Sequence, residues 1–116
     1  MKKTFSHVGI PTTESKAGEI YAADMKLHLT DFTASANNIE WLRFDADCEM
    51  PKEIMEHTHV AYVVDSLEEA IAGEKVILDP CDVDENLRIA FIVDGEGCPV
   101  EFMEFKGEAA ASGSAY

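Results

Sequence analysis

The sequence is poor in positive charge: 9 Lys and Arg residues stand against 23 Asp and Glu residues, which gives a formal net charge of −14 at pH 7. An excess of this sign repels phosphate backbones and anionic lipid surfaces. We therefore expect no nucleic acid and no membrane among the partners of this protein. Anionic substrates are disfavoured at long range as well, unless a bound cation reverses the local field.

Long apolar runs are absent too, since no segment approaches the roughly 20 apolar residues that a membrane-spanning helix needs. Two lysines follow Met1 without an apolar stretch behind them, so we expect no signal peptide. The three cysteines are odd in number and include no CxxC pair, which favours free thiols over a disulfide framework. These features predict a cytoplasmic protein.

The remaining composition is ordinary, because 47% hydrophobic and 28% charged residues in a chain of 116 are typical of one globular domain. We expect that domain over residues 1–106. Residues 107–116 are small, polar and without pattern, which predicts a flexible tail.

Two similar segments each carry a histidine. Residues 5–14 (FSHVGIPTTE) resemble residues 57–66 (HTHVAYVVDS), and in each a histidine precedes a valine, a small residue and an apolar residue. These histidines are His7 and His59. An internal repeat of this kind indicates a duplicated structural unit.

A second pair of segments carries a glutamate in each copy. Residues 38–44 (NIEWLRF) resemble residues 99–105 (PVEFMEF), and Glu40 and Glu101 occupy the same place between an apolar and an aromatic residue. Both pairs of segments occur in the same order along the chain. The sequence therefore predicts two copies of one unit, each with one histidine and one glutamate.

The second copy has the clearer secondary-structure pattern. Ser66, followed three residues later by Glu69, forms a capping box that would begin a helix over residues 67–73, and Gly73 is a suitable residue for its end. A turn is expected over residues 94–97. Strands are expected over residues 59–65, 75–81, 87–95 and 98–105.

The first copy is shorter. Its pattern predicts strands over residues 5–11, 26–32 and 39–47, a short helix over residues 14–23, and a linker over residues 50–56. His7 and Glu40 are 33 residues apart, whereas His59 and Glu101 are 42 apart, and the difference is about one strand with its turn. We therefore expect an α+β fold of two tandem βαβββ modules, over about residues 4–48 and 56–106, with three strands in the first module and four in the second.

Strand alternation places each of the four polar residues on an otherwise apolar or small-residue face. The neighbours on these faces are Leu42 and Phe44 for Glu40, Met103 and Phe105 for Glu101, Phe5, Gly9 and Pro11 for His7, and Ala61 and Val63 for His59. A buried carboxylate is unfavourable unless it is paired or bound to a metal. Two histidines and two glutamates suit Zn²⁺, Ni²⁺, Co²⁺, Mn²⁺ or Fe²⁺, whose identity the set leaves open.

Each of these residues has a simpler explanation when taken alone, since a single histidine or glutamate in a strand is usually solvated. Their recurrence at the same places in both copies is what favours metal binding. His57 lies two residues before His59 and is a competing ligand, but its counterpart is Phe5, so we favour an exposed His57. His28 has no counterpart, which predicts a surface or cavity-lining side chain.

The chain resembles the vicinal oxygen chelate superfamily over about residues 5–105, in the motifs HVGIPTTE, IEWLRF, HVAYVVDSLEEAI and VEFMEF. This superfamily includes glyoxalase I, methylmalonyl-CoA epimerase, extradiol dioxygenases, and fosfomycin and bleomycin resistance proteins. The resemblance implies a cupped mixed sheet with helices outside, built from paired βαβββ modules around a divalent metal. It also implies that the first and last strands of each module supply the ligands, which are here His7, Glu40, His59 and Glu101.

The ligand set looks like that of the glyoxalase I and epimerase branches. The resemblance then implies an isomerase or lyase that abstracts a proton next to the carbonyl of a small substrate, with the metal as Lewis acid. Glu101 would be the base, with Glu40 as its rival, and His7 and His59 would only hold the metal. The branch also implies a homodimer, in which the four residues come from one chain or from two.

Two other functions stay open. The sequence has no basic cluster for the carboxylates of glutathione or the phosphates of CoA, so a non-catalytic protein that binds antibiotics or other hydrophobic ligands is the alternative. A dioxygenase needs open positions on iron, and a fourth protein ligand disfavours it.

Overall fold

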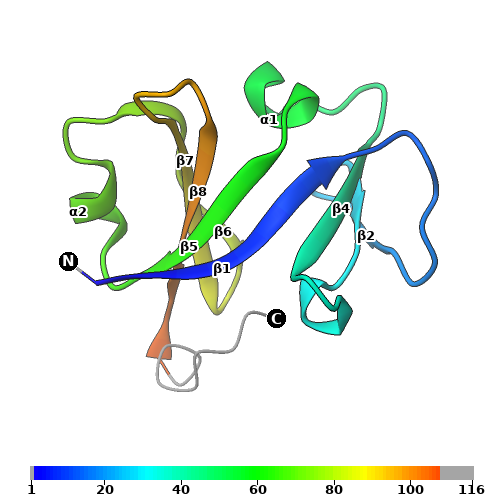
Figure 1. The fold of residues 1–116 in the computed structure, drawn as a ribbon, viewed down its shortest axis with the longest axis horizontal. Coiled ribbons are helices and arrows are strands. Elements are labelled where there is room, and N and C mark those ends of the chain that lie inside the picture. The colour runs from blue at the N-terminus through cyan, green and yellow to red at the C-terminus, as the bar shows by residue number, and fades with distance from the viewer. Residues whose placement is uncertain (1, 108–116) are drawn as a thin grey trace.

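The computed structural model describes residues 2–107, which form eight strands and three short helical segments (Figure 1). The strands are β1 (Lys3–Pro11), β2 (Ile20–Ala22), β3 (Leu27–Leu29), β4 (Ile39–Phe44), β5 (His59–Val64), β6 (Lys75–Asp84), β7 (Leu87–Val93) and β8 (Pro99–Phe105). The helical segments are η1 (Phe32–Ala34), α1 (Lys52–Glu56) and α2 (Leu67–Ile71).

All eight strands belong to one curled, mixed sheet in the order β2-β3-β4-β1-β5-β8-β7-β6. The first strands of the two halves, β1 and β5, lie antiparallel at its centre, and each is flanked on its outer side by the last strand of its own half in parallel orientation. The expected α+β fold with a cupped mixed sheet is confirmed. The helix α2 lies on the outside of this sheet (Figure 1).

The first half departs from the sequence-based prediction. The helix expected over residues 14–23 is wrong, because this segment contains bends, turns and the strand β2. Gly18 has a φ of +77°, which an α-helix does not allow. Both halves therefore have four strands, and the expectation of three in the first was also wrong. The shorter spacing reflects the missing helix and the three-residue lengths of β2 and β3.

The second half follows its sequence pattern closely. Ser66 Oγ accepts a hydrogen bond from the Glu69 amide at 3.2 Å, as the capping box predicts. Gly73 has a φ of +75°, which suits the expected end of the helix. The linker between the halves contains α1, a single helical turn that the sequence pattern did not predict, and buries Ile54 against the sheet.

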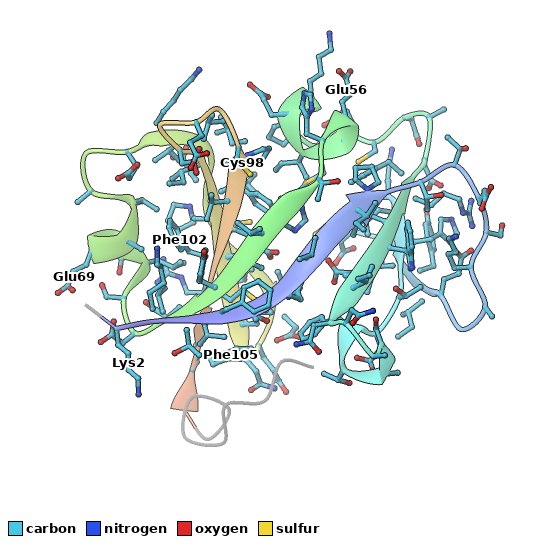
Figure 2. The ribbon with its side chains drawn as sticks, viewed as in Figure 1. Lys2, Glu56, Glu69, Cys98, Phe102 and Phe105 are labelled. Atoms are coloured by element: carbon cyan, nitrogen blue, oxygen red, sulfur yellow. The ribbon has the colours of Figure 1, made fainter. Side chains whose placement is uncertain are left out.

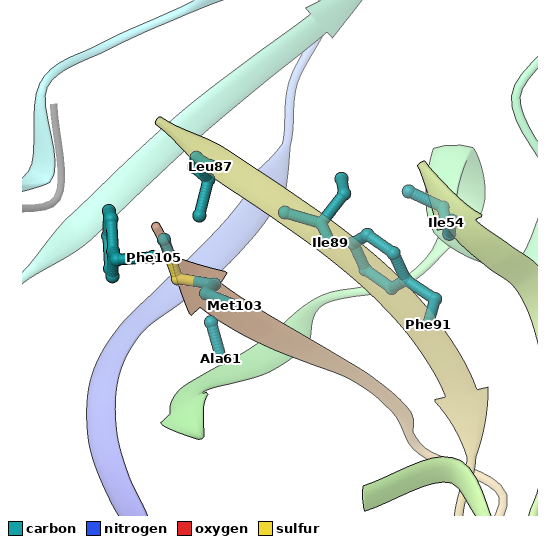
Figure 3. Packing of buried hydrophobic residues seen from close by; sticks show 7 residues of the cluster. All are labelled: Ile54, Ala61, Leu87, Ile89, Phe91, Met103 and Phe105. Carbon is teal, nitrogen blue, oxygen red and sulfur yellow. The ribbon is translucent and has the colours of Figure 1, made fainter. Parts of the chain in front are cut away.

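The hydrophobic core lies mainly in the second half, where β7 and β8 are buried on both faces. On the face that α2 covers, Phe102, labelled in Figure 2, belongs to a cluster with Leu67, Ala70 and Ile92. On the other face a cluster is formed by Ile54, Ala61, Leu87, Ile89, Phe91, Met103 and Phe105 (Figure 3). The alternating side chains of each strand thus fill two separate clusters.

Several expectations concern features outside this core. Cys48, Cys81 and Cys98 are free thiols, as the sequence predicted. None of the helices among residues 2–107 is long and apolar enough to cross a membrane. Apart from Gly107, the predicted tail over residues 107–116 lies outside the described residues.

The cluster of Figure 3 gives a direct stability test. Met103 is fully buried, so Met103→Ala is expected to lower the free energy of unfolding by about 2–5 kcal/mol in urea denaturation. Ile20 is 59% exposed, and Ile20→Ala serves as the control with an expected change within about 0.5 kcal/mol. Equal effects of the two substitutions would contradict the assignment of this core.

Candidate metal centre

The register of the central strands brings the four polar residues together in two rows. In the first row Gly9 on β1 pairs with Glu40 on β4 at one side and with His59 on β5 at the other. In-register neighbours in a sheet point to the same face. Glu40 and His59 therefore flank Gly9 on one side of the sheet.

The second row repeats this arrangement with the two halves exchanged. Ala61 on β5 pairs with His7 on β1 at one side and with Glu101 on β8 at the other. His7 and Gly9 are two residues apart on β1, so both rows face the same side. A small residue thus occupies the middle of each row, and a histidine of one half lies beside the small residue of the other half.

The four side chains converge closely. His7 Nε2 lies 3.4 Å from Glu40 Oε1 and 3.4 Å from Glu101 Oε1, and His59 Nε2 lies 3.2 Å from Glu101 Oε1. One donor atom from each of the four residues falls within 4.8 Å of the other three. All four residues are buried, with exposed fractions between 0% and 7%.

A β-bulge gives His7 an additional partner. The register between β1 and β5 shifts between Phe5 and His7, and Phe5 pairs with Tyr62 instead of continuing the His7 face. The expectation that Phe5 shares the face of His7 is therefore wrong. The bulge brings Ser6 Oγ to 2.9 Å from His7 Nδ1. A neutral His7 that donates Nδ1–H to Ser6 presents the Nε2 lone pair to the cluster.

Two aromatic rings fix the imidazoles. Phe32 of η1 stacks on His7 with a centroid distance of 4.1 Å and an interplanar angle of 16°. Phe91 of β7 meets His59 edge to face, with a centroid distance of 4.9 Å and an angle of 80°. Sequence reasoning missed Ser6, Phe32 and Phe91, since no repeat marks them and only tertiary contacts connect them to the cluster.

Gly9 is a further residue whose role only the structure shows. A Cβ atom at this position would lie 2.1 Å from His59 Cε1 and 2.4 Å from His59 Nε2. The imidazole of His59 thus lies directly over the Gly9 backbone, in space that any side chain would occupy. The equivalent place in the other row, beside His7, holds Ala61.

The electrostatics of the cluster favour a positive charge at its centre. Burial would lower the pKa of His7, but hydrogen bonds with Glu101 and Glu40 outweigh it and raise this pKa to about 9. Burial would likewise raise the pKa of Glu101, but hydrogen bonds with His59 and His7 lower it to about 2. Without metal, the cluster therefore favours a proton on His7 beside the ionised carboxylate of Glu101.

The residues present fit a divalent ion. Nitrogen and oxygen atoms bound to one ion at about 2.0–2.2 Å lie roughly 3–4.4 Å apart, which is close to the separations in this cluster. A set of two imidazoles and two carboxylates suits Zn²⁺, Ni²⁺, Co²⁺, Mn²⁺ or Fe²⁺. The two carboxylates also balance the charge of a divalent ion, which would replace the proton of His7.

The other histidines lie outside the cluster. His57 is exposed, as the sequence analysis favoured. His28 is on β3, where its ring nitrogens lie 3.4 Å from Asp45 and 3.7 Å from Glu19, and its ring tilts against Tyr21. Neither residue belongs to the group of four potential metal ligands found among residues 2–107.

A small cavity, which we call the inner cavity, adjoins the cluster and has a volume of about 60 Å³. Its polar lining consists of Glu40, His59 and Glu101. The other lining residues are all apolar, namely Met25, Leu27, Leu29, Leu42, Phe44, Met50, Ile54, Val83, Leu87, Ile89 and Phe91. Both carboxylates are therefore accessible to a ligand in this cavity, whereas His7 does not line it.

The curled mixed sheet agrees with the fold that the resemblance to the vicinal oxygen chelate superfamily implied. A solved structure that shares it is the crystal structure of methylmalonyl-CoA epimerase from Mycobacterium tuberculosis, with a TM-score of 0.61 over 93% of this chain and 91% of that chain. The sequence identity is 19%, so this likeness shows the fold alone. No family model matches the sequence, and no curated protein does.

The close approach of His59 to Gly9 predicts a sharp effect of one methyl group. Gly9→Ala is expected to displace the His59 imidazole and to weaken metal binding by about 10–100-fold, measured by competition with a chromophoric chelator. Gly95→Ala is the control, because a Cβ there meets nothing within 4 Å. Unchanged metal affinity in Gly9→Ala would contradict the position of His59.

The raised pKa of His7 gives a second expectation. Below a pH of about 9 the imidazole is protonated, so metal binding through Nε2 must release that proton. Zn²⁺ binding near neutral pH should release about one proton per ion, and the affinity should rise with pH until His7 is neutral. Calorimetric titration in buffers of different ionisation enthalpy measures this release. His28→Gln should leave it unchanged, and no release from the wild-type protein would contradict the expectation.

Proposed function

We propose that this protein is a divalent-metal-dependent isomerase or lyase that abstracts a proton next to the carbonyl of a small substrate. The observation that carries the proposal is the convergence of His7, Glu40, His59 and Glu101 within 4.8 Å beside an apolar cavity. In this proposal all four residues hold the metal. The epimerase with the same fold supports an isomerase, since its name describes that class of reaction.

The bound ion would supply Lewis-acid chemistry, which withdraws electron density from a carbonyl and makes the neighbouring C–H bond more acidic. The protein residues hold the metal, form the cavity and move the proton. His7 and His59 are fixed by their aromatic neighbours and serve only as ligands. The apolar lining of the inner cavity excludes water, which strengthens electrostatic interactions in the site.

Glu101 is the proposed base. It lines the inner cavity with Phe91, its register neighbour on β7, so its carboxylate can meet a substrate that lies against the apolar wall. Hydrogen bonds with His59 and His7 lower the pKa of Glu101 to about 2, so its carboxylate is ionised and able to accept a proton. Glu101 takes the proton from carbon and returns it to the substrate, so the reaction needs no other reactant. Glu40 lines the same cavity and is the rival base.

The proposal includes a small-molecule substrate, a homodimer, as the resemblance implies, and a location in the cytoplasm, as the cysteine pattern and the expected lack of a signal peptide favour. The four donor atoms converge within one chain. A second chain is therefore not needed to complete the proposed centre, and dimerisation would serve another purpose.

The proton abstraction is testable by isotope exchange. The metal-loaded protein is expected to exchange the proton next to the carbonyl of small hydroxyketones with solvent deuterium, followed by NMR. Glu101→Gln should slow this exchange by about 100-fold or more. Gln keeps an oxygen donor, so the metal content, measured in each variant, should largely persist.

Two variants sharpen this test. Glu40→Gln should slow exchange less than Glu101→Gln, and the reverse order would make Glu40 the base. Glu104→Gln is the matched control, because Glu104 lies on the same strand but contacts Arg88 and the Leu67 amide. Failure of the metal-loaded wild-type protein to exchange any tested compound would contradict an enzymatic role.

The alternative function is a non-catalytic protein that binds hydrophobic ligands, including antibiotics. The observation that favours it is the apolar lining of the inner cavity, which gives a ligand few polar partners apart from Glu40, His59 and Glu101. Titration of apolar ligands into metal-loaded and metal-stripped protein separates the two functions. Equal affinities would support the binding protein, and binding that requires metal would support the enzyme.

A further inference from the structure

The inner cavity limits how much of a ligand can lie beside the proposed metal centre. Its volume is about 60 Å³, whereas a cavity of about 150 Å³ is known to hold a benzene molecule. A ligand can therefore place its metal-binding oxygens and a short apolar group there. Any larger part of the ligand must extend out of the inner cavity.

A second cavity, which we call the mouth, adjoins the inner cavity and has a volume of about 370 Å³. Met25, Leu29 and Val83 line both cavities. The mouth lies between the β2–β3 segment of the first half and β6 of the second half, which hold the two edges of the sheet. It is thus the neighbouring space into which the outer part of a ligand could extend.

The polar side chains of the mouth are all acidic. Asp24, Asp31 and Asp82 line it, and neither the mouth nor the inner cavity is lined by a lysine or arginine. Lys106 Nζ lies 2.7 Å from Asp82 and balances that one carboxylate.

Asp24 and Asp31 make no ion pair with a basic group among residues 2–107 and keep the mouth negative. Asp31 is held in its ionised form by hydrogen bonds from Thr33, which lower its pKa.

The proposed metal does not offset this negative charge. A divalent ion carries two positive charges, which Glu40 and Glu101 balance when both are ionised. The field at the mouth is then set by its own carboxylates and by the large negative charge that the rest of the chain retains, since the formal net charge of −14 includes Glu40 and Glu101. A negatively charged group on a ligand meets repulsion there without a compensating partner.

We propose that the site takes small chelating compounds whose part beyond the metal-binding oxygens is apolar and uncharged or cationic, and that Asp24 and Asp31 exclude compounds with a further anionic group. This inference rests on the proposed metal centre and deepens it. It separates this protein from the solved epimerase of the same fold, whose named compound is a CoA thioester. The phosphates of CoA and the carboxylates of glutathione belong to the excluded class.

Three hydroxamic acids of equal length test the inference. Butanohydroxamic acid is uncharged beyond its chelating group, succinic monohydroxamic acid ends in a carboxylate, and 3-aminopropanohydroxamic acid ends in an ammonium group. Their dissociation constants are measured on the Co²⁺-loaded protein from the visible absorption of the cobalt. We expect the anionic compound to bind about tenfold more weakly than the uncharged one, because two unpaired charges act on it in largely aqueous surroundings. The cationic compound should bind at least as tightly as the uncharged one.

Variants of the mouth test whether its carboxylates cause the weaker binding of the anionic compound. Asp24→Asn with Asp31→Asn removes both unpaired charges, and Asn retains the ability of residue 31 to cap η1. This double variant should reduce the tenfold difference to about twofold. The matched control is Asp65→Asn with Glu69→Gln, which removes the same charge from the outer side of the second half, where Glu69 lies (Figure 2). The control should keep the difference, and added salt should reduce it in the wild-type protein.

The possible results of these binding measurements separate a failure of the inference from a failure of the proposed function. Equal affinities for the anionic and uncharged compounds at low salt would overturn the inference, while the spectral change itself would still support a metal centre that binds chelators. A difference that both double variants reduce equally would place its origin in the total charge and overturn the role of the mouth. Absence of Co²⁺ binding by the four ligands would overturn the proposed function and the inference with it.

Discussion

The antiparallel pairing of β1 with β5 is the constraint on which the candidate metal centre depends. It places His7 opposite Ala61 and His59 opposite Gly9, so each histidine lies beside the small residue of the other half. Parallel pairing with β4 and β8 then adds a glutamate to the outer end of each row. A slip of one residue between β1 and β5 would turn a histidine to the opposite face. The centre is therefore a joint property of both halves.

The burial of two carboxylates is the second constraint, because such groups are unfavourable in an apolar interior without a positive partner. A proton on His7, which its raised pKa favours, meets this requirement in the absence of metal, and a divalent ion would meet it with two charges. Folding and metal binding are thereby coupled through the same four side chains. The apolar surroundings that make this charge necessary also form the wall of the inner cavity. The same arrangement of charged side chains within an apolar wall therefore determines both the stability of the fold and the proposed chemistry.

The two halves contribute unequally to this arrangement. The second half supplies most of the core, since β7 and β8 are buried on both faces. The first half supplies two of the four polar residues and the stacking ring of Phe32, but has short strands and no α-helix between them. The turn between its short strands β2 and β3 lies at the mouth, where Asp24 is exposed. The reduction of the first half thus affects access to the site more than the site itself.

The sequence alone determined the duplication, the α+β class, the elements of the second half and the four residues that converge. It could do so because these features depend on local patterns, which need no tertiary contacts. The patterns are the alternation of side chains along strands, the capping box at Ser66, and the repeated histidine and glutamate. Only the tertiary structure decided the rest. In the first half, the segment predicted to be a helix contains β2 instead. This strand is stabilised by pairing with β3 and not by local propensity. The roles of Ser6 and Gly9 follow from a bulge and from contact across strands, which connect residues that the sequence keeps apart.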